Sequence, residues 1–177
     1  MISRIVCTIC LITVMSLTAM SQDVPKVEVF AGVSWAGGNF KGPNTSATVN
    51  INKWLGLTAD YSGHYGSERP GVVLISQNAQ TFQAGPRVAL RGKRLTPFFY
   101  ALFGGTRFKQ SATINGQYLS ESDSGFASTY GGGLDVKVTG RVSIRAFQID
   151  YFRPNFFGEA HNRGRLSAGV VFKFGRR

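Results

Sequence analysis

The sequence predicts an all-β protein, an eight-stranded antiparallel up-and-down transmembrane β-barrel. Three observations predict this fold. Segments of about ten residues alternate between apolar and polar side chains, which is the period-two pattern of strands. Short and long connections between these segments also alternate, so that all the short turns fall at one end. Glycine is frequent (22 of 177 residues) and phenylalanine is the main aromatic (14), a composition that disfavours a helical bundle.

Residues 1–21 are predicted to be a cleaved signal peptide. Arg4 supplies the positive charge, Ile5–Leu17 forms an apolar run, and Ala19–Ser21 is a small-x-small cleavage site. A membrane anchor is the alternative, but the run is shorter than the roughly 20 residues that a spanning helix needs. We therefore expect export, with residues 22–177 forming the barrel domain.

Both cysteines, Cys7 and Cys10, lie in the predicted signal peptide. The mature chain would therefore have no cysteine, which excludes disulfides, thiolate catalysis and cysteine-ligated zinc. The net charge of +11 becomes +10 when Arg4 is removed. Acidic phospholipid or lipopolysaccharide at a membrane surface would take up this charge. Nucleic acid is the alternative partner for a basic chain, and export disfavours it.

Eight segments share the alternation of a strand. In chain order these are Val27–Trp35, Ala47–Asn52, Leu55–Ser62, Thr81–Leu90, Leu95–Thr106, Phe126–Val138, Arg141–Phe152 and Arg165–Phe174. Pro86 interrupts the fourth, and proline usually marks a bulge or a sheet edge because it cannot donate to the ladder. In the seventh, Arg145 and Gln148 have opposite parity, and a bulge near Ala146–Phe147 would restore a common face.

The connections differ in length at the two ends of the predicted barrel. Three short turns at one end are Asn52–Lys53, Arg91–Arg94 and Thr139–Gly140. Four longer loops at the other end are Gly37–Pro43, Gly63–Asn78, Arg107–Ser124 and Pro154–Gly158. Membrane barrels have this asymmetry. A soluble barrel or sandwich, the alternative fold, has no reason to separate loop lengths in this way.

The two faces of the strands differ in chemistry. One carries Leu, Val, Ala and Phe with almost no charge, whereas the other carries glycine, serine, threonine and charges of both signs. Periodicity alone does not say which face is inside. Buried charges must pair, however, and charges of both signs make that pairing feasible in a filled lumen. The expected interior charges are Glu28, Asp60, Arg87, Asp135, Arg145, Asp150, Arg165 and Lys173.

Aromatic residues and cations are predicted to mark the membrane boundaries. Girdles of aromatic residues are expected at both interfaces of a membrane barrel. The candidates are Trp35, Trp54, Tyr61, Phe98, Phe99, Tyr151, Phe172 and Phe174. Cations cluster at the short-turn end, among them Lys53, Arg91, Lys93, Arg94 and Arg141. Two readings stay open for them: they hold the rim against anionic headgroups, or they form a solvated rim.

The strands Lys26–Trp35, Leu95–Gly105 and Arg163–Phe174 resemble those of the small outer-membrane β-barrel domain of the OmpA/OmpX-like type. Within the second, Thr96–Gly105 has the order of proline, aromatics and then small residues of that family's central strand. The resemblance implies an outer-membrane location, assembly by the outer-membrane machinery, and roles in envelope integrity, adhesion or small-solute passage. It departs at the C-terminus, where Gly175–Arg177 follow the closing aromatic.

The sequence shows no convincing enzyme site. The two histidines, His64 and His161, both lie in predicted loops. Some outer-membrane barrels modify lipid A with a histidine, a serine and an acid, and His161 with Ser167 and Glu159 could be read in that way. Ser167, however, lies on the expected interior face, away from lipid. A solvated loop histidine is the favoured interpretation of both residues.

Metal and nucleotide sites are disfavoured on similar grounds. His64, Tyr65 and Glu68 supply too few ligands to hold a metal. The run Gly131–Gly133 lacks the strand-then-helix context of a nucleotide-binding loop. No cofactor is expected, and we expect a structural or interaction protein that meets an extracellular partner through its outer loops. The alternatives are a narrow pore for ions or small solutes, since side chains nearly fill an eight-stranded barrel, and a lipid A-modifying enzyme.

Overall fold

The computed structural model describes residues 24–37, 40–68, 74–114, 117–156, 159–160 and 162–176. The strands in this part are β1 (Pro25–Trp35), β2 (Lys41–Asn50), β3 (Leu55–Glu68), β4 (Leu74–Ala89), β5 (Leu95–Ile114), β6 (Gln117–Lys137), β7 (Val142–Phe156), β8 (Glu159–Ala160) and β9 (Arg163–Arg176). Within these ranges there is no helix long and apolar enough to cross a membrane. The predicted signal peptide, with Cys7 and Cys10, lies outside the described residues, and so does His161.

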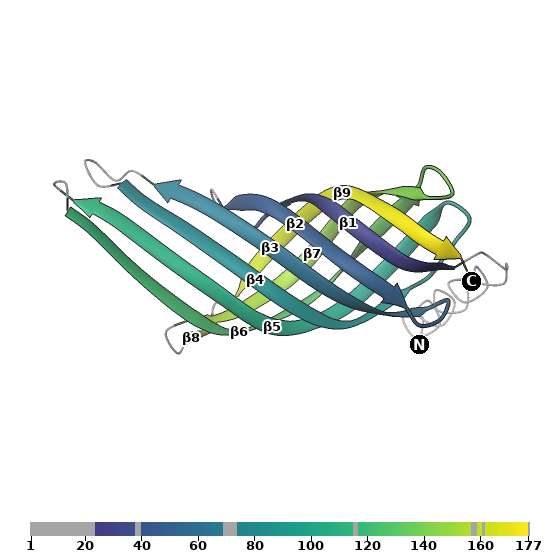
Figure 1. The fold of residues 1–177 in the computed structure, drawn as a ribbon, viewed down its shortest axis with the longest axis horizontal. Coiled ribbons are helices and arrows are strands. Elements are labelled where there is room, and N and C mark those ends of the chain that lie inside the picture. Colours follow the sequence, from purple (N-terminus) through teal and green to yellow (C-terminus); the bar gives the residue numbers. More distant parts are fainter. Residues whose placement is uncertain are drawn as a thin grey trace, which may run out of the picture.

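The strands close into a barrel. Pairing runs in the order β6-β5-β4-β3-β2-β1-β9-β7, and an additional β6–β7 pairing joins the two ends of this sheet. Every pairing is antiparallel, and the two-residue β8 pairs only with Asn155 and Phe156 at the end of β7. The predicted eight-stranded antiparallel barrel is therefore confirmed (Figure 1). Closure matters in a membrane because each backbone N–H and C=O then has a partner.

Burial is inverted relative to a water-soluble barrel. Along β4, for example, Gln83 is fully buried while its neighbour Phe82 is 62% exposed. The same alternation buries Thr58 in β3 and exposes Leu57. Because side chains on a strand point alternately to opposite faces, the polar set fills the lumen and the apolar set covers the outside. Only a surrounding of hydrocarbon makes this arrangement favourable.

Two strand irregularities were predicted, with different outcomes. The bulge near Ala146–Phe147 is confirmed, because Arg145 pairs with Gly169 but Gln148 pairs with Ser167, which places one extra residue in β7. Pro86, in contrast, marks neither a bulge nor an edge. It lies within β4, opposite Leu57 of β3, and the pairing with β5 lapses at Gly85 and Pro86 without a change of register.

The prediction that Gly63–Asn78 and Arg107–Ser124 form irregular loops is wrong. β3 continues to Glu68 and β4 begins at Leu74, with cross-strand pairing up to Glu68 and Ile75. β5 and β6 pair as far as Ile114 and Gln117. The row of apolar residues on the outward face ends here, while the backbone ladder continues regardless of side-chain polarity.

Candidate functional site

The half of the lumen near the short-turn end contains a network of ion pairs. Arg87 of β4 bridges Glu28 of β1 (Nη1–Oε2, 2.7 Å) and Asp135 of β6 (Nη2–Oδ2, 3.0 Å). Asp135 also accepts a hydrogen bond from Arg145 Nε of β7 at 2.8 Å. Arg91, in the β4–β5 turn, pairs with the second oxygen of Glu28. β1, β4 and the neighbouring strands β6 and β7 are thereby connected across the lumen.

Two buried phenylalanines support these guanidinium groups. Phe98 is 1% exposed, and its ring lies 4.3 Å from the guanidinium carbons of both Arg87 and Arg145. Phe30 lies 4.2 Å from Arg145. The prediction of Phe98 as an interface aromatic is therefore wrong. Neighbouring residues on a strand face opposite ways, so Phe98 points into the lumen and Phe99, 63% exposed, points outward.

The half of the lumen farther from the short-turn end contains a second cluster, centred on Arg165 of β9. Arg165 Nε lies 2.7 Å from Asp150 Oδ2, and its Nη1 lies 3.4 Å from Asp60 Oδ1. Asp150 also accepts a hydrogen bond from the Tyr100 hydroxyl. Asn44 donates to the other oxygen of Asp60 at 2.9 Å. Both carboxylates are thus held by neutral donors as well as by the arginine.

Gln148 connects the two clusters. It accepts from Arg145 Nη1 at 2.7 Å and donates to Asp150 Oδ2 at 3.0 Å. Of the eight predicted interior charges, the structure buries all except Lys173, which is half-buried and lies opposite Glu28 in the β1–β9 pairing. The four buried carboxylates face four arginines, which are Arg87, Arg91, Arg145 and Arg165. The buried carboxylates and arginines are therefore equal in number, and the half-buried Lys173 adds one further positive charge.

His64 is not a solvated loop residue, contrary to the prediction. It is 4% exposed within β3, and its Nε2 lies 2.8 Å from Ser34 Oγ, which is itself fully buried. The histidine is enclosed because β3 continues past the predicted strand end. Ser167, the serine considered for lipid modification, is also fully buried in the lumen. An acyl chain on the outer surface of the barrel has no access to either serine.

The other predicted interface aromatics are exposed. They are Trp35, Trp54, Tyr61, Phe99, Tyr151, Phe172 and Phe174, between 39% and 63% exposed. Two more exposed phenylalanines lie on one row of the outward face, because Gly105 of β5 pairs with Phe82 on one side and Phe126 on the other. Phe82 and Phe126 are 62% and 60% exposed. This row is the last apolar one before β4, β5 and β6 become polar.

Four strands continue well beyond this row. β5 and β6 have 20 and 21 residues, whereas β1 and β2 have 11 and 10, and about 9–11 residues suffice to cross a bilayer. β3 to β6 reach past the other strands at the end opposite the termini (Figure 1). We call this part the outer extension. It comprises residues 65–68, 74–80, 106–114 and 117–125.

The outer extension has an open edge. Among the described residues, β7 pairs with β6 only from Ala127 to Lys137, and Asn155 of β7 still lies against Gly125, so that Gln117–Ser124 pairs with β5 alone. An edge strand has a partner strand on one side only and can accept another strand on the other side. Glu121 and Asp123 lie along it. Charged residues on an edge limit pairing with copies of the same strand, since like charges would then meet.

The outward face of the outer extension is basic. The row next to the phenylalanine row consists of Gln80, Arg107 and Ser124, and the following row of Asn78, Lys109 and Ser122. Both cations are exposed. Residues two apart on a strand are separated by about 7 Å along it. Arg107 and Lys109 therefore lie directly outside the apolar belt, among hydroxyl and amide groups.

These features define an outer-membrane β-barrel. The chain belongs to the outer membrane protein beta-barrel domain family, whose model matches residues 7–174. Among curated proteins, none matches. The protein is located in the outer membrane, so the short-turn end, where β1 begins and β9 ends, faces the periplasm and the outer extension faces outward.

Solved structures show the same fold. Ail, the attachment invasion locus protein of Yersinia pestis, is 19% identical over 86% of this chain and 100% of its own, with a TM-score of 0.58. Neisserial surface protein A is 17% identical over 84% and 94%, with a TM-score of 0.54. The N-terminal β-barrel domain of Pseudomonas aeruginosa OprF is 14% identical over 86% and 100%, with a TM-score of 0.52. Ail has also been solved in complex with the heparin analogue sucrose octasulfate.

Proposed function

We propose that this outer-membrane barrel is a structural and interaction protein without catalytic activity. Its filled lumen serves as a rigid anchor, and its outer extension meets partners outside the cell in adhesion. The open edge of β6 is the observation that carries the proposal, because a free strand edge can accept a strand of another protein. The name of Ail as an attachment protein supports this reading by analogy.

Shortening the outer extension tests this role. Deleting residues 108–113 and 118–123 removes six residues from each strand, preserves the pairing of Ile114 with Gln117, and keeps every remaining side chain on its face. A non-adherent bacterial host that produces the full-length protein should attach to cultured epithelial cells. The host with the shortened variant should lose this attachment, because the β6 edge is gone and the β4 edge that the deletion uncovers, residues 74–79, has a different sequence.

The gel mobility of unboiled samples provides the control for the shortening experiment. Both proteins should migrate as folded barrels and reach the outer membrane in equal amounts, since the transmembrane pairing is unchanged. Attachment that persists at the full level would place the interaction on another part of the protein.

We also propose lipopolysaccharide as a partner of the outward face of the outer extension. Arg107 and Lys109 lie beside the apolar belt, at the depth where lipid A phosphates meet water, and guanidinium groups bind phosphate well. The sulfated ligand of Ail is a polyanion of comparable chemistry. The excess positive charge of the chain supports the same partner.

Neutralising both cations should weaken this contact. We expect the Arg107→Gln/Lys109→Gln variant to bind lipopolysaccharide micelles about tenfold more weakly than the parent, since two charge-assisted contacts are lost. The measurement is titration of the barrel in neutral detergent. The variant Lys93→Gln/Arg94→Gln removes the same charge at the opposite end and should bind as the parent does. Equal losses in both variants would show attraction by net charge without a site.

Three further parts of the proposal concern biogenesis and transport. We propose export through cleavage after residue 21 and insertion by the outer-membrane assembly machinery.

The two arginine clusters, around Arg87 and Arg165, cross the lumen at different positions along the barrel axis. Ion passage would require both to open, and each is held by buried ion pairs. We therefore place the narrow pore second to the anchoring and adhesion role.

A further inference from the structure

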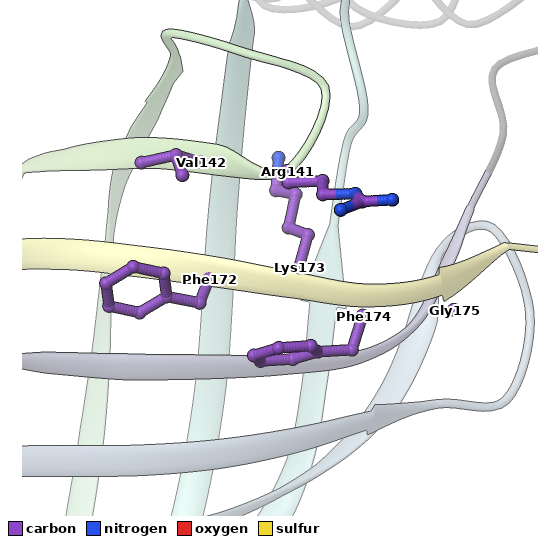
Figure 2. Close-up of a pocket in the computed structure, with 6 residues that line it drawn as sticks. All are labelled: Arg141, Val142, Phe172, Lys173, Phe174 and Gly175. Carbon is purple, nitrogen blue, oxygen red and sulfur yellow. The ribbon is translucent and has the colours of Figure 1, made fainter.

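A groove lies at the periplasmic end of the barrel where β7 and β9 meet. It has a volume of about 470 Å³ and is lined by Arg141, Val142, Phe172, Lys173, Phe174 and Gly175. Figure 2 shows the two phenylalanine side chains along β9 and Arg141 just before β7, with the Lys173 side chain extending from β9 toward Arg141. The groove therefore joins an apolar wall to two cations, the exposed Arg141 and the half-buried Lys173.

The apolar wall of the groove belongs to the lipid-facing surface. Phe172 and Phe174 are 43% and 55% exposed, and Val142 lies directly opposite Phe172 in the β7–β9 pairing. The three side chains have the outward parity of their strands. A hydrocarbon chain that lies along them buries apolar surface on both sides, which is favourable per unit area.

Cations lie at both sides of the groove. Arg141 is exposed at its β7 side, and its guanidinium has no ion pair with the described residues. Gly175 has a φ of 64°, and a Cβ placed on it would lie 3.2 Å from Lys26 Cβ and 3.3 Å from Lys26 Cγ and Cδ. The Lys26 stem therefore lies against Gly175, at the β1 side.

The surrounding rim carries no competing negative charge in its turns. The described turns at residues 51–54, 90–94 and 138–141 contain no aspartate or glutamate. They contain four further cations besides Arg141: Lys53, Arg91, Lys93 and Arg94. Of these, Arg91 is paired with the interior carboxylate of Glu28, and none of the four lines the groove. The groove thus offers apolar surface to an acyl chain and a guanidinium, that of Arg141, which has no ion pair with the described residues.

We propose that this groove binds one anionic phospholipid of the periplasmic leaflet. Its phosphate pairs with Arg141, whose planar guanidinium presents two parallel donors to phosphate oxygens. Lys26 adds positive charge at the other side, and one acyl chain lies along Phe172 and Phe174. The occupant is a phospholipid because the short-turn end of an outer-membrane barrel faces the periplasm, and it is anionic because the rim is basic.

Native mass spectrometry of the barrel, purified from outer membranes in detergent, tests the site. Phosphatidylglycerol and phosphatidylcholine with the same acyl chains are titrated separately. The parent should retain one phosphatidylglycerol more tightly than the next ones, and should bind phosphatidylcholine about tenfold more weakly. Arg141→Gln should lose the tight phosphatidylglycerol. Arg141→Lys should bind with intermediate strength, because it keeps the positive charge and loses the two parallel donors of the guanidinium.

Arg94→Gln is the matched control, since it removes one rim cation in the β4–β5 turn. It should bind as the parent does, and all variants should keep the gel mobility of a folded barrel because both positions are exposed. An equal loss in Arg94→Gln and Arg141→Gln would overturn the proposal in favour of attraction by the whole rim. Equal binding of phosphatidylcholine would also overturn it, as would displacement of the lipid by millimolar glycerol phosphate, which would indicate a site for soluble phosphate.

Discussion

Replacing Arg165 with methionine should lower the free energy of unfolding by about 3–5 kcal/mol, the usual loss when one partner of a buried ion pair is removed. Arg165 is 2% exposed and contacts both Asp60 and Asp150. Methionine has similar length and is apolar, so the variant leaves two buried carboxylates without their cation. Urea unfolding of the barrel in lipid vesicles, followed by tryptophan fluorescence, measures the change.

A triple variant separates the buried charge from the loss of packing. Arg165→Met combined with Asp60→Asn and Asp150→Asn removes all three charges and keeps amide groups that accept hydrogen bonds from Asn44 and Tyr100. This variant should recover most of the lost stability, because replacing a whole buried ionic cluster is often nearly neutral. A loss below about 1 kcal/mol for Arg165→Met alone, the value typical of exposed pairs, would mean that water screens these charges in the lumen.

The arrangement of the lumen explains how a barrel with polar contents is stable. Two arginine side chains reach strands on different sides of the ring: Arg87 contacts β1 and β6, and Arg165 contacts β3 and β7. Desolvation of a charge is costly, and direct pairing with several hydrogen bonds offsets it. The contacts of Arg87 with Glu28 and of Arg165 with Asp60 join strands that are not neighbours in the ring, so they stabilise the closed barrel as a whole. A rigid ring is a suitable base for a long outer extension.

The barrel itself could be predicted from the sequence because hydrocarbon imposes a strict alternation. Apolar side chains must face lipid at every second position, as in Leu55, Leu57 and Ala59 of β3, and the opposite positions are then interior. The parity slip between Arg145 and Gln148 predicted the bulge in β7 for the same reason. Where lipid ends, this constraint ends, and the strands of the outer extension carried no such signal.

The contacts within the lumen could not be predicted from the same pattern. Alternation assigns Glu28 and Arg87 to the same face of the sheet. Whether the two side chains come into contact depends on how far β1 and β4 are shifted along the barrel axis, and that shift is the sum of the staggers between all neighbouring strands from β1 to β4. Phe98 shows a second limit. Two adjacent aromatics cannot share a face of one strand, yet Phe98 and Phe99 were both assigned to the interface. No feature of the sequence distinguishes an aromatic side chain that packs against arginines inside the lumen from one that faces the membrane interface.

Replacing Gly169 with alanine should destabilise the barrel by about 3 kcal/mol, near the upper end for overpacking a buried site. Gly169 of β9 lies opposite Gly32 of β1, where the ends of the chain close the ring. A Cβ at Gly169 would lie 2.3 Å from the Ala31 carbonyl oxygen, 2.5 Å from Gly32 Cα and 2.9 Å from Phe30 Cε2. Two of these atoms are backbone, so relief requires β1 and β9 to separate.

Gly105→Ala is the matched control for this substitution, since a Cβ at Gly105 meets nothing within 4 Å. It lies on the outward face of β5, and its loss of unfolding free energy should stay within about 0.5 kcal/mol, as for other surface substitutions. Urea unfolding in vesicles again provides the measurement. Gly169→Ala also displaces Phe30, whose ring supports Arg145 at 4.2 Å, so its effect should be larger than a local clash alone. If both variants unfold at the same urea concentration, then β1 and β9 pack less closely than the glycine pair requires, and the ring is not closed tightly at this seam.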